Sequence, residues 1–291
     1  MCVPIDEVAD WRLSDEAFLK AFKLPQKGSG ALALLYPFPR EDRISFDEEK
    51  HEYTIDGKKA PRSVTGLLHE YAQEFDATRA LVAMKNGREW DAKKAAMEED
   101  GLATDDASIL CRWQRNGEVA RARGHLLHYQ AEMLANGRII ELPHSPELQQ
   151  AIAIYERLLG EGLQPFRAEV NLFHCGLRVA GQPDLLMRDP DNNVVIVDWK
   201  RAKSIKTEND RCHLKYPLGH LPDTNYWHYS LQVNVYGYIL ESEYGMKVAG
   251  YKLAVVHPDA SRPKLINCPR MDAEMSLIRD FEIEQGRASS A

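Results

Sequence analysis

The chain has 291 residues, of which 44% are hydrophobic, and a formal net charge of −7 at pH 7. This length accommodates one large domain or two small ones with a real core. The acidic balance argues against a protein that coats nucleic acid non-specifically, because such domains are strongly basic, but it leaves room for a local basic groove.

The sequence shows no segment that would target the chain to a membrane. No apolar run is long enough to span a bilayer, and the first residues lack the basic and apolar regions of a signal peptide. The five cysteines are scattered without a C-x-x-C pair, which predicts reduced thiols, no zinc ribbon and no iron–sulfur cluster. We therefore expect an intracellular protein that is neither secreted nor membrane-bound.

The first third of the chain is predicted to change from strands to helices. Residues 1–42 look peripheral, with a short amphipathic helix over 10–22. Residues 44–55 and the turn at Asp56-Gly57 predict strand, turn and strand. Ser63 is expected to cap the next helix, and a phosphate site at that helix start is the alternative.

Residues 65–160 have a mostly helical pattern, interrupted by an acidic loop at 98–106. A long helix over 113–134 carries His128 and Glu132, which share a face because they are four residues apart. A further amphipathic helix is expected over 145–159, and the sheet is expected to begin at Pro165.

A hairpin over 179–203 is the centre of the predicted sheet. If the turn formers at 189–193 close it, Arg188 faces Val194 and Asp184 faces Asp198. Directly opposed residues have Cβ atoms roughly 4.5–5.5 Å apart. Lys200 projects from the same face as Asp198, because side chains alternate along a strand.

The preceding strand is expected to add a third carboxylate. With Cys175-Gly176 as a tight turn, Glu169 pairs opposite Gln182, and this parity places Glu169 on the face of Asp184. Downstream, residues 205–225 are expected to form a loop. A helix over 227–244 carries Gln232 and Tyr236, a strand follows at 248–256, and the chain ends with a helix over 272–284.

Paired carboxylates repel each other unless a cation lies between them. Mg²⁺ and Mn²⁺ bind such oxygen ligands together with water and phosphate, and a bound metal activates water. Lys200 would orient or deprotonate the attacking water or stabilise developing charge, and Glu169 could hold the water or a second metal. The basic residues that follow either bind flanking phosphates or form a solvated loop.

At this point the sequence resembles a known family. Glu169, Gly181-x-Pro183-Asp184 and Asp198-Trp199-Lys200 resemble the PD-(D/E)XK nuclease signature. Gln232-x-x-x-Tyr236 and Gly124-x-x-x-His128 are similar to motifs of its RecB-like exonuclease branch. His51-x-Tyr53, Gly57 and Ser63-Val64-Thr65 resemble the opening of viral, phage and mitochondrial genome maintenance exonucleases, and the resemblance covers roughly residues 44–257.

The resemblance implies an α/β fold with a restriction-endonuclease-like core, a central mixed sheet flanked by helices, and a helical N-terminal portion. It implies a metal site and a catalytic lysine, Lys200. The metal, Mg²⁺ or Mn²⁺, would be held by His128, Asp184, Asp198 and the main-chain carbonyl of Trp199. Glu169 is a further candidate ligand from its predicted place beside these residues. Gln232 and Tyr236 would contact DNA or support the site. Further DNA contacts are expected from Arg201, Lys203, Lys206, Ser63, Thr65, Arg121 and Arg123.

The resemblance predicts a peripheral segment at 1–42, a nuclease domain at 43–260, and a helix and tail at 261–291. The nuclease domain would contain a helical portion (63–160), the catalytic sheet (165–203) and the motif helix (227–244). Arg201 and His125 depart from the branch, which commonly has small hydroxyl residues there, but no metal ligand is lost. The expected activity is a DNA exonuclease, with a structure-specific or nicking endonuclease, a non-catalytic DNA-binding module, or an RNA-directed enzyme as alternatives.

Overall fold

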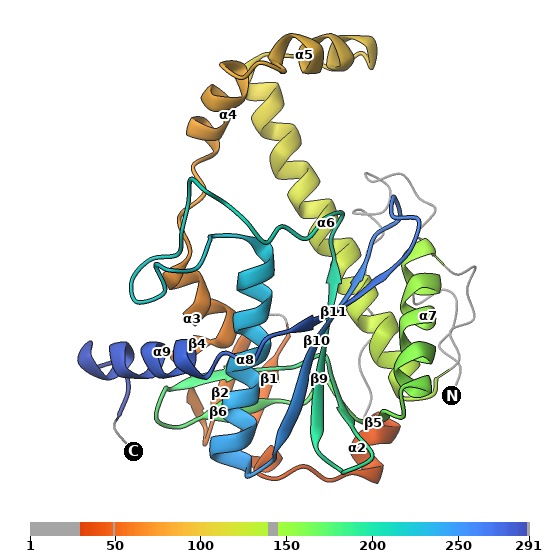
Figure 1. The fold of residues 1–291 in the computed structure, drawn as a ribbon, viewed down its shortest axis with the longest axis vertical. Coiled ribbons are helices and arrows are strands. Elements are labelled where there is room, and N and C mark those ends of the chain that lie inside the picture. Colours follow the sequence, from red (N-terminus) through yellow and green to blue (C-terminus); the bar gives the residue numbers. More distant parts are fainter. Residues whose placement is uncertain (1–29, 49, 139–144, 290–291) are drawn as a thin grey trace. The chain divides into compact units, whose positions relative to one another are not determined.

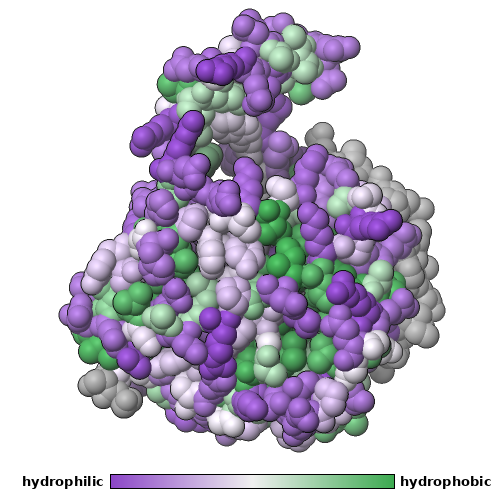
Figure 2. All heavy atoms as spheres, viewed as in Figure 1, coloured by the Kyte–Doolittle hydropathy of each residue, from purple (hydrophilic) through white to green (hydrophobic). Residues whose placement is uncertain are grey.

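The computed structural model describes residues 30–48, 50–138 and 145–289, so the helix expected over 10–22 lies outside the described residues. Two compact units can be distinguished: one contains 30–73 and 126–289, and the other contains 74–125. Hydrophilic side chains cover most of the face of each unit that Figure 2 shows. None of the described helices is long and apolar enough to cross a bilayer.

The larger unit is a mixed α/β structure (Figure 1). Its helices are α2 (Ala31–Leu35), the 3-10 helix η2 (Glu41–Arg43), α3 (Val64–Tyr71), the last part of α6 (Asp106–Ala135), α7 (Pro146–Gly160), α8 (Asn225–Tyr244) and α9 (Asp272–Glu284). Its strands are β1 (Ile44–Asp47), β2 (Glu52–Ile55), β3 (Lys58–Lys59), β4 (Arg62–Ser63), β5 (Gln164–Ala168), β6 (Leu172–His174), β7 (Val179–Gly181), β8 (Leu185–Arg188), β9 (Val194–Arg201), β10 (Val248–Val256) and β11 (Lys264–Cys268).

Five strands form the central sheet in the order β11-β10-β9-β8-β5. The β9–β10 pair is parallel, and the other three pairs are antiparallel. The sheet is therefore mixed, as predicted. Two three-stranded sheets, β1-β2-β3 and β4-β7-β6, complete the described strands.

The β8–β9 hairpin has the predicted register. Arg188 pairs with Val194, and the ladder continues to Leu185 opposite Val197. The main-chain N–H of Asp189 donates to the carbonyl of Asn193 at 3.0 Å and closes the loop. The next position along this register brings Asp184 opposite Asp198, just beyond the last paired residues.

Residues 179–188, expected to be one strand, are divided in the structure. β7 ends at Gly181 and β8 begins at Leu185. Pro183 lies in this break and has no N–H to donate to a ladder. The opposite segment is broken as well, since β5 ends at Ala168 and β6 begins at Leu172.

The two breaks face each other. A turn over residues 175–178, longer than the predicted Cys175-Gly176 turn, pairs Leu172 with Gly181. The same register brings Glu169 opposite Asp184, and the Glu169 N–H donates to the Asp184 carbonyl at 3.1 Å. The predicted pairing of Glu169 with Gln182 was wrong by two residues. Because two residues are one full period of a strand, Glu169 kept its predicted face.

Alternation along β9 gives the sheet two different faces. Val195, Val197 and Trp199 pack with buried residues of α6 and α7. Val194 and Ile196 point the other way, into a core that includes α3, α8 and α9. Asp198 and Lys200 have the parity of Ile196, so both project toward α8.

The expected helix ends are well marked in the structure. The Ser63 hydroxyl accepts the Gly66 N–H at 2.9 Å and caps α3, as predicted. Gly245 ends α8 with a left-handed φ of 62°, a conformation that glycine adopts without steric cost. β11 was missed, because it is a short edge strand of five residues in which polar and apolar positions do not alternate.

The smaller unit contains α4 (Ala77–Lys85), α5 (Trp90–Glu99) and the first part of α6. Asp76 caps α4 by accepting the Arg79 N–H at 2.9 Å, and the acidic stretch before α6 contains a short non-helical connection, as predicted. Leu81 and Ile109 are its most deeply buried hydrophobic side chains.

Candidate active site

Asp184 occupies the break between β7 and β8 and is bound on both sides. Its Oδ1 lies 3.1 Å from Nδ1 of His128, and its Oδ2 accepts the main-chain N–H of Trp199 at 2.6 Å. The carboxylate is therefore fixed between α6 and the main chain near the end of β9. Only 8% of the residue is exposed.

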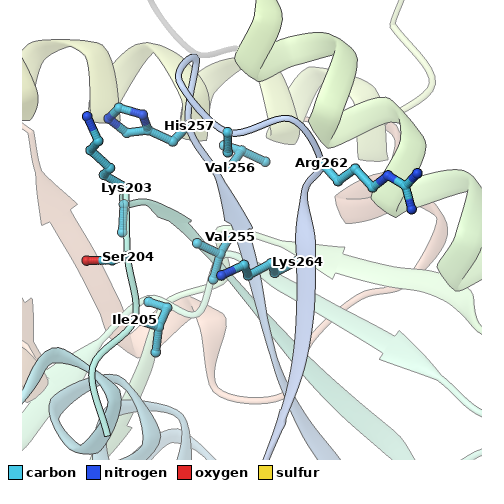
Figure 3. Close-up of a pocket in the computed structure, with 10 residues that line it drawn as sticks. Lys203, Ser204, Ile205, Val255, Val256, His257, Arg262 and Lys264 are labelled. Atoms are coloured by element: carbon cyan, nitrogen blue, oxygen red, sulfur yellow. The ribbon is translucent and has the colours of Figure 1, made fainter.

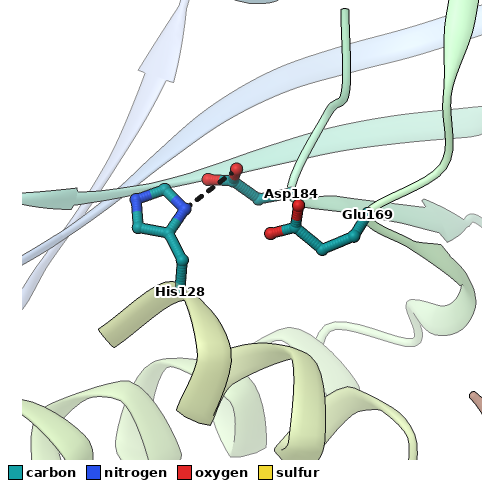
Figure 4. Close-up of side chains that lie close together, drawn as sticks. All are labelled: His128, Glu169 and Asp184. Carbon is teal, nitrogen blue, oxygen red and sulfur yellow. Dashed lines mark hydrogen bonds and ion pairs between the residues drawn. The ribbon is translucent and has the colours of Figure 1, made fainter. Parts of the chain in front are cut away.

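His128, Glu169 and Asp184 converge (Figure 4). One potential ligand atom from each lies within 4.8 Å of the others. Glu169 reaches this position with a φ of 49°, which costs a non-glycine residue on the order of 1 kcal/mol or more. The surrounding structure holds Glu169 in this conformation, and such strain is typical of functional sites.

Neighbouring charges shift the pKa values of His128 and Asp184 in opposite directions. Burial alone would lower the pKa of His128, but the Asp184 and Glu169 carboxylates raise it to about 9. Burial opposes ionisation of Asp184, yet His128, Lys200 and the Trp199 N–H keep its pKa below the usual value. The raised pKa favours a protonated imidazole beside these two acids.

Asp198 lies beside this group and pairs with Lys200. Its Oδ2 is 2.7 Å from the Lys200 ammonium nitrogen. The residue is 1% exposed, and apart from this contact with Lys200 neither carboxylate oxygen has a hydrogen-bond partner among the described residues. Burial, partly offset by Lys200, raises the pKa of Asp198 to about 6. Buried carboxylate oxygens with so few partners are suited to bind a cation.

Helix α8 positions Lys200 from the other side. The Lys200 ammonium group donates to Oε1 of Gln232 at 2.9 Å, and Gln232 donates to the Tyr236 hydroxyl at 3.2 Å. The Lys200 nitrogen also lies 4.5 Å from the centre of the Tyr229 ring, which favours a cation. Tyr229 was missed, although its spacing of three residues from Gln232 places both on one helix face.

A family model for the PD-(D/E)XK nuclease superfamily matches residues 57–285. The chain belongs to the PD-(D/E)XK nuclease superfamily. Its fold is accordingly restriction-endonuclease-like, with the mixed sheet and helices described above. The prediction of this family from the sequence is confirmed, while no curated protein sequence matches the chain.

Two solved structures of low similarity were also found. A crystal structure of an exonuclease candidate from Eubacterium rectale has a TM-score of 0.28 and 14% identity, over 49% of this chain. This chain spans about half of that one, 56% of its length. A crystal structure of a protein named SSO0001 has a TM-score of 0.29 and 16% identity, over 68% of this chain and 84% of the other.

The predicted DNA contacts near the candidate site have different surroundings. Tyr236 is only 3% exposed, so it supports Gln232 and is poorly placed to touch DNA. The Arg201 side chain lies 2.9 Å from a Glu147 oxygen, and both side chains are largely buried. Lys203 is exposed and paired with Asp259 at 2.9 Å. The roles of these residues in binding stay predictions.

The remaining predicted contacts are spread over both units. Ser63 is occupied as the α3 cap, and its hydroxyl also lies 3.0 Å from that of Thr65. Lys206 is exposed at the start of the loop that leads to α8. Arg121 and Arg123 belong to the part of α6 that lies in the smaller unit, where Arg121 is exposed.

Like Tyr229, Tyr53 lies near the candidate site although no role there was predicted for it from the sequence. It is 7% exposed on β2, and burial together with the charges of Glu169 and Asp184 raises the pKa of its hydroxyl. Tyr53 therefore forms part of the buried wall around the carboxylates. It lies in the His51-x-Tyr53 stretch, which could have identified it.

Gly181 is required for the packing that supports Tyr236. A Cβ at this position would lie 2.7 Å from Cε1 of Tyr236 and 2.8 Å from Cγ2 of Val64. We expect Gly181→Ala to lower the free energy of unfolding by about 1–3 kcal/mol and to reduce activity by displacing Tyr236 and Gln232. Denaturant unfolding checks this, with Gly117→Ala as the control.

The control position, Gly117, has space for a larger side chain. A Cβ at Gly117 would meet no atom within 4 Å, and in a helix interior alanine is more favourable than glycine by about 1 kcal/mol. We therefore expect Gly117→Ala to stabilise the protein. If Gly181→Ala were equally stable and active, Gly181 would have no packing role.

Proposed function

We propose that this chain is a metal-dependent DNA nuclease of the RecB-like branch that acts as an exonuclease on ends or single strands. The observation that carries the proposal is the group formed by His128, Glu169 and Asp184, beside the buried pair of Asp198 and Lys200. A structural core has no reason to gather three acids and a lysine around a strained backbone.

The residues present fit a divalent metal. Glu169, Asp184 and Asp198 offer carboxylate oxygens, and those of Asp198 have no partner among the described residues except the Lys200 ammonium group. Mg²⁺ and Mn²⁺ prefer such oxygen ligands. His128 adds a ring nitrogen, and the carbonyl of Trp199 remains a proposed fifth ligand. When bound, the metal would activate water and offset charge on the phosphate.

The protein's own groups would align the other components of the reaction. Lys200, held by Gln232 and Asp198, places a positive charge beside the carboxylates. There it would orient the attacking water and stabilise the charge that develops on the phosphate oxygens. Glu169 would accept a hydrogen bond from that water. Trp199 contributes its N–H, which fixes the orientation of Asp184.

Two features support the RecB-like branch and exonuclease activity. His128 of the Gly124-x-x-x-His128 motif lies in the ligand group, and Gln232 of the Gln232-x-x-x-Tyr236 motif contacts Lys200. Both features add to the PD-(D/E)XK core at positions where that branch has its own motifs.

A digestion time course tests the proposal directly. End-labelled linear, circular and single-stranded DNA would be incubated with Mg²⁺ or Mn²⁺, with and without EDTA. We expect stepwise shortening of linear or single-stranded DNA, no cutting of circles, and loss of activity with EDTA that added metal restores. Cut circles would instead identify an endonuclease, and nucleic-acid binding without cleavage would indicate a non-catalytic module.

A further inference from the structure

A shallow pocket lies where the ends of β9 and β10 meet the β10–β11 hairpin (Figure 3). The segment that follows β9 forms one wall, with Lys203, Ser204 and Ile205. The start of β11 forms the other, with Lys264. Figure 3 shows the Lys264 side chain extending over β10 toward Ile205, whereas Arg262 points away from the pocket.

Strand register relates this pocket to the proposed active site. Lys200 pairs with Val255 on β10, and Val255 pairs with Lys264 on β11. Paired residues project from the same face of a sheet. Neighbouring strands are about 4.8 Å apart, so the Lys264 backbone lies roughly 10 Å from that of Lys200, on the face that carries it.

Packing on that face agrees with the register. Val255 belongs to the core beneath α8, and Ile266, two residues after Lys264, packs against the same core. Leu265 packs on the opposite face. Lys264 therefore has the orientation of Lys200 but lies at the exposed edge of the sheet, where its amine faces solvent.

Lys264 extends toward the segment that follows β9, whereas Lys203 extends the other way, alongside His257, and both are available to a ligand (Figure 3). Among the described ranges, no acidic partner is found for Lys264. Lys203 pairs with Asp259, but their side chains are 75% and 56% exposed, and such surface pairs contribute little. Lys203 is three residues beyond Lys200, or about 10 Å along an extended chain. Both cations therefore lie within a few nucleotides of the proposed cleavage position.

We propose that Lys264 and Lys203 bind backbone phosphates of the nucleic-acid strand on one side of the scissile bond, and that Asp259 weakens this contact by pairing with Lys203. This inference rests on the proposed function. A lysine binds a phosphate as a point charge and releases counterions from the nucleic acid. The pocket thereby gives an acidic protein a local binding surface for a phosphate chain.

Salt dependence of binding provides the test. Binding of the full chain to a fluorescent single-stranded oligonucleotide would be measured by anisotropy across a salt series, with EDTA present to prevent turnover. We expect Lys264→Ala to weaken binding on the order of three- to tenfold and to reduce the slope of log K against log[salt] by about 0.7, the value for one phosphate contact on a single strand. Lys203→Ala should behave alike.

Two further variants separate this role from general effects of charge. Lys247 is an exposed lysine that immediately precedes β10, at the end of that strand far from Val255. Lys247→Ala changes the net charge as Lys264→Ala does, but should leave the salt slope unchanged. Asp259→Asn releases Lys203 and should tighten binding, a gain that misfolding cannot produce.

The outcomes distinguish this inference from the proposed function. If the wild-type chain binds and cleaves DNA but Lys264→Ala matches Lys247→Ala, or Asp259→Asn weakens binding, the pocket has no phosphate role and the nuclease proposal stands. If the wild-type chain neither binds nor cleaves nucleic acid, the proposed function fails first.

Discussion

Lys200→Met is expected to reduce cleavage by roughly 10²–10⁴-fold, the range for loss of a residue that assists proton transfer or charge development. Methionine has a similar length and keeps contact with the Tyr229 ring, but it cannot donate to Gln232 or pair with Asp198. The rate of digestion of end-labelled DNA at saturating metal measures the effect.

Stability must be followed in the same variant. The substitution leaves the buried Asp198 carboxylate without its positive partner, which destabilises a protein even when the ion pair itself contributes little. We therefore expect a lower melting temperature without metal. The double variant Asp198→Asn/Lys200→Met removes both charges and should recover stability but not activity.

A matched substitution tests whether any lysine of the sheet would have the same effect. Lys252 lies on β10 and pairs with Glu161 at 3.3 Å. Lys252→Met should retain near-wild-type cleavage. Wild-type cleavage by Lys200→Met would refute the assignment of Lys200 as the catalytic lysine.

Asp184→Asn is expected to abolish cleavage together with the response of the protein to metal. For a ligand at about 100 times its dissociation constant, binding stabilises the native state by about 2.7 kcal/mol. In a domain of this size, this raises the melting temperature by roughly 5–10 °C. The variant lacks one anionic ligand of the proposed site, so its melting temperature should not change with Mg²⁺ or Mn²⁺.

Thermal unfolding with and without metal measures this response, and EDTA should reverse it in the wild-type protein. Asp189→Asn serves as the control, because Asp189 is an aspartate of the same hairpin whose carboxylate binds the Asn193 N–H in the loop. It should keep both the metal response and activity. A normal metal-dependent shift in Asp184→Asn would show that the metal, if any, binds elsewhere.

Much of the hairpin and its chemistry could be predicted from the sequence. The turn residues at 189–193 determine the register of β8 and β9, and strand periodicity then gives the faces of Asp184, Asp198 and Lys200. Helix α9 also has the expected bounds. These features depend on local patterns, which a sequence contains.

Other features depend on contacts between distant segments. The left-handed conformation of Glu169 and the break at Pro183 arise where one ladder separates into two sheets, and no local pattern marks that point. The Tyr229 contact with Lys200 depends on how α8 crosses the sheet. The relevance of Lys264 follows from the pairing of β11 with β10, and β11 itself was not predicted.

The main-chain hydrogen bond between Glu169 and Asp184 affects how the positions of these two residues respond to substitution. It links the two segments that carry the proposed ligands through atoms that no side-chain replacement removes. Exchanging either acid for its amide therefore alters charge without releasing the other residue from its place. Separation of β6 from β7 would displace both acids at once, so the proposed active site depends on the integrity of this small sheet.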